Sequence, residues 1–139
     1  MNRFENISVR GFRRLQNIEL EMRNLIVMIG ANGAGKTSFL DVLSILPASA
    51  SGNLQNLLQL KGGLNEILTR GKVQELEIKI SMQVPDQQPL LYNLTLSPKG
   101  LSYEVRDEYL TSKPCDSIYL NGSALLGFLC CVKDSSLTS

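Results

Sequence analysis

The sequence contains no histidine and no tryptophan, and its only cysteines are Cys115, Cys130 and Cys131. Zinc sites combine cysteine and histidine at defined spacings, and an adjacent pair with a distant third cysteine lacks such spacing. The sequence therefore does not support a zinc-binding function. We expect reduced cysteines with a structural role, and redox sensing is the alternative.

Long apolar runs and an excess of charge are also missing. The longest apolar stretches, Leu25–Ile29 and Ala124–Val132, are much shorter than the roughly 20 residues of a membrane-spanning helix. The first residues, Met1–Glu5, include charges and no apolar core of a secretory signal. A net charge of +1 gives no electrostatic reason to expect nucleic acid or an anionic membrane as a partner. We expect a cytoplasmic protein without membrane contact, and 139 residues fit one domain.

One glycine-rich stretch carries the clearest functional signal, IVMIGANGAGKTSFLDVL over Ile26–Leu43. The apolar run Leu25–Ile29 predicts a strand buried on both faces. The residues that follow read G-x-x-x-x-G-K-T, the Walker A phosphate loop. Its main-chain amides, the positive end of the following helix and the Lys36 ammonium group all favour phosphate. The alternative is a glycine-rich turn with Lys36 in solvent.

The apolar spacing predicts the elements around this loop. Alternating residues predict strands over Phe4–Val9 and Ile18–Met22, with a turn at Arg10–Arg14, so that the loop follows the third strand. After the loop, a core-facing helical stripe ends before Pro47 and consists of Phe39, Val42, Leu43 and Leu46.

The remainder divides into an insertion, a meander and a tail. Residues 48–72 predict a short helical insertion, with Leu54, Leu57 and Leu58 at helical spacing. Residues 73–110 predict a three-stranded antiparallel meander with one solvated face. A last strand is expected within Cys115–Leu120. We interpret residues 1–122 as one lobe and residues 123–139 as a truncated or divergent tail.

Hydrolysis needs a group that the sequence does not supply. Phosphoryl transfer uses a carboxylate at the end of a second buried strand, to hold magnesium and polarise water. Downstream of Thr37 no apolar run ends in an acid, and the nearest candidate, Asp134, is separated from Val132 by a lysine. We therefore assign no catalytic residue, and a complete small P-loop kinase is disfavoured. The guanine-reading Asn-Lys-x-Asp pattern is absent too, which favours ATP as the nucleotide.

The motifs together resemble a known family. Ile7-x-Val-x-Gly-Phe-Arg13, Leu20, and Ile29-Gly-Ala-Asn-Gly-Ala-Gly-Lys-Thr-Ser-Phe-Leu-Asp41 resemble the amino-terminal half of predicted AAA-type ATPases of the ABC and SMC/RecF group. The likeness covers roughly residues 4–120. It implies an α/β fold, a P-loop NTPase lobe of the ABC/SMC head type with a mixed sheet. It also implies a homodimer or a partner ATPase subunit, and contact with DNA.

The resemblance implies the site residues. By match, the triphosphate would be lined by Gly30, Asn32, Gly33, Gly35, Lys36, Thr37 and Ser38. Thr37 would hold Mg²⁺, and Arg13 would lie near the phosphates, with a solvated arginine as the alternative. The family's signature loop, acidic strand end and switch histidine have no counterpart here. We therefore expect an ATP-binding lobe that is incomplete for hydrolysis; the alternative is a non-catalytic interaction module or split-ATPase subunit.

Overall fold

The computed structural model describes residues 3–68, 74–112 and 118–119. They form two amino-terminal strands, then helices, then the remaining strands. The elements are β1 Arg3–Phe12, β2 Leu15–Glu21, α1 Lys36–Ala50, α2 Leu54–Leu60, α3 Leu64–Ile67, β3 Leu76–Gln83, β4 Leu90–Lys99, β5 Ser102–Ser112 and β6 Ile118–Tyr119. The predicted tail, residues 123–139, and the three cysteines lie outside the described residues.

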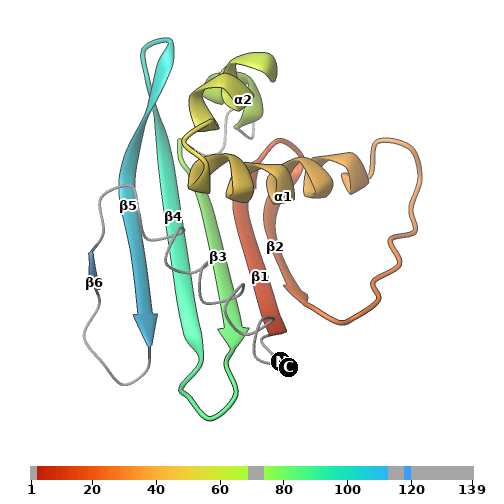
Figure 1. Cartoon of the computed structure of the whole chain (residues 1–139). Coiled ribbons are helices and arrows are strands. Elements are labelled where there is room, and N and C mark those ends of the chain that lie inside the picture. The colour runs from red at the N-terminus through yellow and green to blue at the C-terminus, as the bar shows by residue number, and fades with distance from the viewer. Residues whose placement is uncertain (1–2, 69–73, 113–117, 120–139) are drawn as a thin grey trace.

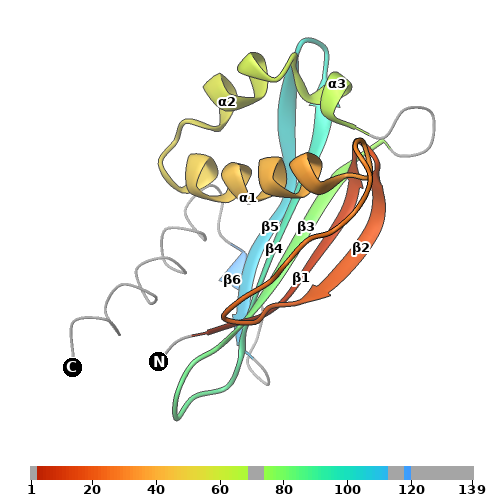
Figure 2. The ribbon, with the colours of Figure 1, turned by 90° about the vertical axis from the view of Figure 1, so that its right-hand side faces the viewer.

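The strands form one six-stranded antiparallel sheet in the order β2-β1-β3-β4-β5-β6. The chain leaves β2, passes through the helices and returns as β3 on the other side of β1, so that the helices cover one face of the sheet (Figures 1 and 2). The predicted early antiparallel strands and the meander of β3, β4 and β5 are confirmed. The parallel part of the expected mixed sheet is not among the described strands.

The core lies between the sheet and the helices. In β3, buried Leu76, Ile78, Ile80 and Met82 alternate with more exposed residues, as a half-buried strand requires. Register aligns apolar residues across the sheet, and one such row runs Leu20, Ile7, Ile80, Tyr92, Leu110. The helices cover this face with Phe39, Val42, Ile45, Leu54, Leu58, Leu64 and Ile67.

One charged group lies on the core side of the sheet. Glu108 is buried on β5, and the Tyr92 hydroxyl donates a hydrogen bond to its Oε1 over 2.9 Å. Burial and the neighbouring Glu108 charge raise the pKa of Tyr92, so its hydroxyl keeps the proton that it donates. This acid therefore has a structural partner within the core.

The predicted helix end at Pro47 is wrong. Helix α1 includes Pro47 and continues to Ala50, and the Ser51 amide still donates to the Pro47 carbonyl over 3.0 Å. Proline lacks an N–H and so removes one intrahelical hydrogen bond, which the packing of this helix offsets. The helix buries Phe39 and Val42 as predicted, with Ile45 as the next buried position; Leu43 and Leu46 pack at the margin.

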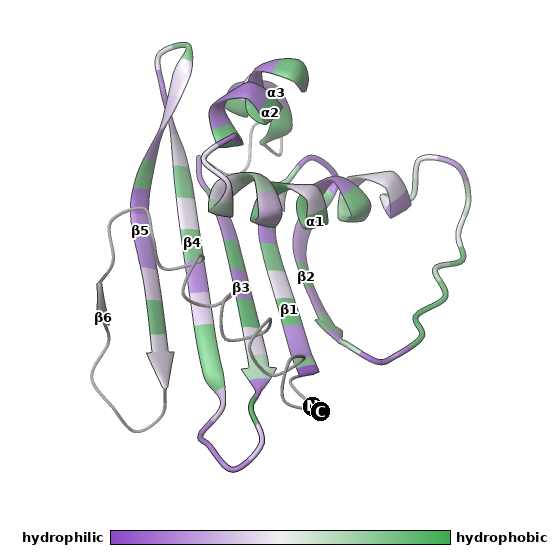
Figure 3. Cartoon of the chain, in the orientation of Figure 1, coloured by the Kyte–Doolittle hydropathy of each residue, from purple (hydrophilic) through white to green (hydrophobic). Residues whose placement is uncertain are grey.

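The predicted buried strand at Leu25–Ile29 is also wrong in this structure. These residues form no strand, and Leu25, Val27 and Ile29 are 79%, 71% and 93% exposed. They lie in the long segment between β2 and α1, which runs away from the sheet (Figures 1 and 3). A strand needs a hydrogen-bonded neighbour, and the described part of the chain places only β1 beside β2. The same segment makes no main-chain hydrogen bond to another described residue over positions 24–29.

Candidate phosphate-binding site

The predicted phosphate loop borders a hollow of about 480 Å³, a volume within the usual range of ligand sites. Its lining consists of Arg13, Arg14, Asn32, Gly33, Gly35, Lys36, Thr37 and Ser38. The structure thus brings together the predicted site residues from the β1–β2 turn and from the loop, except for Gly30. It adds Arg14, which the sequence analysis missed.

Two glycines give the loop its path into α1. Gly33 and Gly35 have φ values of 83° and 106°, a region that side chains rarely tolerate. A Cβ atom on Gly33 would lie 2.9 Å from a guanidinium nitrogen of Arg14, and one on Gly35 would lie 3.1 Å from a Leu15 methyl carbon. Both positions therefore favour glycine for their backbone conformation, and a side chain at Gly33 would also displace the Arg14 guanidinium.

The loop leads directly into the amino terminus of α1. Gly35 is its N-cap residue, the Phe39 amide donates to the Gly35 carbonyl over 3.0 Å, and the first turn contains no acidic residue. The first amides of a helix have no intrahelical acceptor and carry the positive end of the helix dipole. The main-chain amides of Lys36, Thr37 and Ser38 are therefore available to an anion at the amino terminus of α1.

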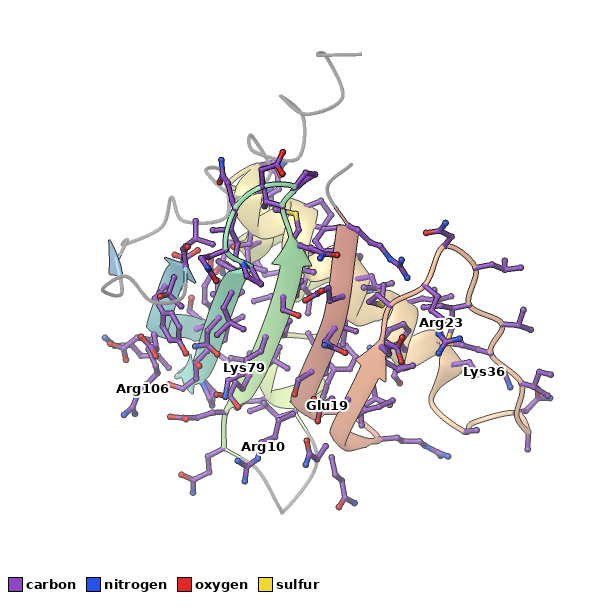
Figure 4. All side chains as sticks on the ribbon, turned by 90° about the horizontal axis from the view of Figure 1, so that it is seen from below. Arg10, Glu19, Arg23, Lys36, Lys79 and Arg106 are labelled. Atoms are coloured by element: carbon purple, nitrogen blue, oxygen red, sulfur yellow. The ribbon has the colours of Figure 1, made fainter. Side chains whose placement is uncertain are left out.

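The Lys36 ammonium group lies over the loop. Its Nζ donates hydrogen bonds to the carbonyl oxygens of Gly30 and Ala31, the latter over 3.0 Å. Figure 4 shows Lys36 beside the long segment, away from the charged residues of the sheet's outer face. The ammonium group thus donates to carbonyl oxygens of its own loop, and phosphate oxygens could accept the same hydrogen bonds.

Arg13 is held by an acid from α1. Its NH1 lies 3.0 Å from Asp41 Oδ2, while Lys61 Nζ at the end of α2 lies 2.7 Å from Asp41 Oδ1. Arg13 has a positive φ of 45° and its guanidinium lies 5.7 Å from the centre of the Phe12 ring. Asp41 therefore ties the β1–β2 turn to both helices. Arg13 lines the hollow, but part of its hydrogen-bonding capacity goes to this acid.

Metal ligands are few in the described lining. Thr37 is exposed at the start of α1, and a threonine hydroxyl is an oxygen ligand of the kind Mg²⁺ accepts beside phosphate oxygens. Among residues 3–68, 74–112 and 118–119, no cluster of three or more histidine, cysteine, aspartate or glutamate side chains could hold a metal ion. The assignment of Thr37 to Mg²⁺ stays a prediction.

Comparison with known proteins decides the family. A family model described as AAA ATPase domain matches residues 3–116. The chain belongs to this ATPase family. A solved structure of the recombination mediator protein RecF-ATP in the RecFOR pathway is similar to the chain, with a TM-score of 0.56 and 16% sequence identity. At this identity the likeness shows the fold alone, a P-loop NTPase-like lobe, and it confirms the expected fold class.

The match is unequal in length. It covers 88% of this AAA ATPase-family chain and 30% of the RecF chain. Curated protein sequences give no match.

In the described part of the chain no helix combines the length and apolar character needed to cross a membrane. The expected cytoplasmic location stays a prediction.

Proposed function

We propose that this chain is an ATP-binding lobe that holds the phosphates of Mg-ATP in the loop between Gly30 and Ser38. The supporting observation is the hollow lined by Lys36 and by the first residues of α1, whose amides have no intrahelical acceptor. Main-chain amides, a helix dipole and a full positive charge would act together on an anion bound there. The similar RecF was solved as RecF-ATP, which agrees with this choice of nucleotide.

In this proposal the lobe binds ATP without hydrolysing it alone. In this proposal the lining binds phosphate and positions Mg²⁺, with Thr37 as the oxygen ligand, and Arg13 and Asn32 are also part of the lining. The described lining includes no acid that could polarise an attacking water. The catalytic carboxylate would therefore come from outside these residues.

A thermal shift measurement tests the binding. Mg-ATP at 100 times its dissociation constant should stabilise the fold by about 2.7 kcal/mol. For a domain of this size that corresponds to roughly 8 °C in the unfolding midpoint. Mg²⁺ alone and AMP with Mg²⁺ are the controls, because neither offers the triphosphate. An unchanged midpoint in a folded sample would reject the proposal.

A second candidate function, a split-ATPase subunit, is favoured by the exposed segment at Leu25–Ile29. Val27 and Ile29 are large apolar residues left in solvent directly before the phosphate loop. A run that is apolar on both faces is typical of a strand in a parallel sheet whose two faces are both covered. We propose that a partner polypeptide pairs with this run through a parallel strand that ends in the missing carboxylate. Homodimerisation and DNA contact stay predictions from the resemblance.

Pairing predicts a gain of activity on mixing. A polypeptide carrying the acidic strand, signature loop and switch histidine should bind this chain, and the mixture should hydrolyse ATP while either chain alone does not. Val27→Lys should abolish both binding and hydrolysis, because it places a charge in the paired strand. Leu101→Lys is the matched control, since Leu101 is fully exposed in the β4–β5 turn. An inactive mixture, or equal effects of the two variants, contradicts the pairing.

A further inference from the structure

Arg14 contacts the phosphate loop from the neighbouring turn. A guanidinium N–H of Arg14 donates a hydrogen bond to the carbonyl oxygen of Gly33, nineteen positions further along the chain. The same side chain lines the hollow beside Lys36. It comes from the turn between β1 and β2, whereas Gly33 and Lys36 come from the loop and α1. Two separate segments therefore bring cations to one site.

The two arginines of the turn have different partners. Arg13 is engaged by Asp41 over 3.0 Å and stacks near Phe12. Arg14 is exposed, and within the described part of the chain it has no acidic partner. Its contact is with a neutral carbonyl, so no described residue compensates the guanidinium charge. A guanidinium group offers five donors in a planar fork that suits phosphate oxygens.

Arg14 and Lys36 make the same kind of contact. Each donates to carbonyl oxygens of the loop, Lys36 to Gly30 and Ala31 and Arg14 to Gly33. Charge-assisted hydrogen bonds to an ionised phosphate are stronger than those to a neutral carbonyl. Both cations would therefore form stronger hydrogen bonds if a phosphate oxygen of the nucleotide replaced the carbonyl oxygen.

We propose that Arg14 is a second phosphate-binding cation of this site, which moves from the Gly33 carbonyl to the triphosphate of the bound nucleotide. This inference rests on the proposed function, since it assigns a further residue to the same ligand. It makes Arg14, rather than Arg13, the basic residue of the turn that contributes most to affinity.

The test compares Mg-ATP affinities by calorimetry in the wild type, Arg14→Gln, Arg14→Lys and Arg10→Gln. Loss of one charge-assisted contact should weaken binding about tenfold or more in Arg14→Gln, and Arg14→Lys should retain part of it. Arg10→Gln removes the same charge from an exposed position on β1, outside this hollow, and should bind as the wild type does (Figure 4). Inorganic triphosphate should show the same loss as ATP.

The outcomes separate this inference from the proposed function. A wild type that binds neither ATP nor inorganic triphosphate overturns both. If the wild type binds and Arg14→Gln binds with equal affinity, the role of Arg14 is overturned, whereas the proposed function stands. The unfolding midpoint of the ligand-free Arg14→Gln should match that of the wild type, because the side chain is exposed. A lowered midpoint with unchanged affinity indicates a purely structural role and contradicts the inference.

Discussion

Replacing Lys36 by alanine is expected to weaken Mg-ATP binding about 10- to 150-fold, the range for a lost hydrogen bond to a charged group. The Lys36 ammonium lies over the loop, where it contacts the Gly30 and Ala31 carbonyls. When a phosphate replaces these carbonyls, the ammonium group gains an ionised partner and a stronger hydrogen bond. Alanine has no group that could make this contact. At a concentration that stabilises the wild type by about 2.7 kcal/mol, a 100-fold loss of affinity leaves about 0.4 kcal/mol.

The matched control for this variant is Lys99→Ala. Lys99 is an exposed residue at the end of β4, and its contact with Glu104 spans 3.9 Å, so its removal should change neither stability nor affinity by much. Thermal shift and calorimetry of both variants with Mg-ATP measure the difference. Equal affinities for Lys36→Ala and the wild type would mean that ATP binds elsewhere.

Replacing Phe12 by alanine is expected to cost about 3–5 kcal/mol of stability, a large share of the 5–15 kcal/mol typical of a domain. Phe12 is fully buried at the end of β1 and pairs with Leu68 in an isolated bridge. The next residue, Arg13, donates its amide to the Ile67 carbonyl over 2.6 Å. The buried side chain of Phe12 and these main-chain contacts together hold the end of β1, next to the turn that carries Arg13 and Arg14.

Urea unfolding measures this cost, and Phe12→Leu and Leu101→Ala are the controls. Leucine keeps most of the apolar volume and should lose less than alanine, whereas fully exposed Leu101 should tolerate alanine with a change within about 0.5 kcal/mol. A Phe12→Ala protein as stable as the wild type would show that this side chain does not hold the core together.

The strands of the meander and the tight backbone path of the glycine-rich loop were predictable because their signals are local. The alternation from Leu76 to Met82 specifies which face of β3 is buried. The glycine spacing around Gly33 and Gly35 specifies a backbone path that few other sequences permit. In both cases neighbouring residues carry the information, and no distant partner is needed.

The errors and the omission arise where contacts distant in the sequence decide. An apolar run such as Leu25–Ile29 becomes a strand only beside another strand, and the described residues provide none there. The contribution of Arg14 was missed because its contact is with Gly33, nineteen positions away, and nothing in the local pattern signals it. Pro47 suggested a helix end, but a proline is tolerated where packing offsets one lost hydrogen bond.

The most direct test is an NMR titration of the chain with Mg-ATP that follows the backbone amides. If the loop encloses the phosphates, the amide signals of Gly33, Gly35, Lys36 and Thr37 should shift in a saturable manner, because these N–H groups would donate to phosphate oxygens. The amide of Gly100, in the β4–β5 turn, should not move. Saturable binding that shifts other residues and leaves the loop amides unchanged would contradict the proposed phosphate site.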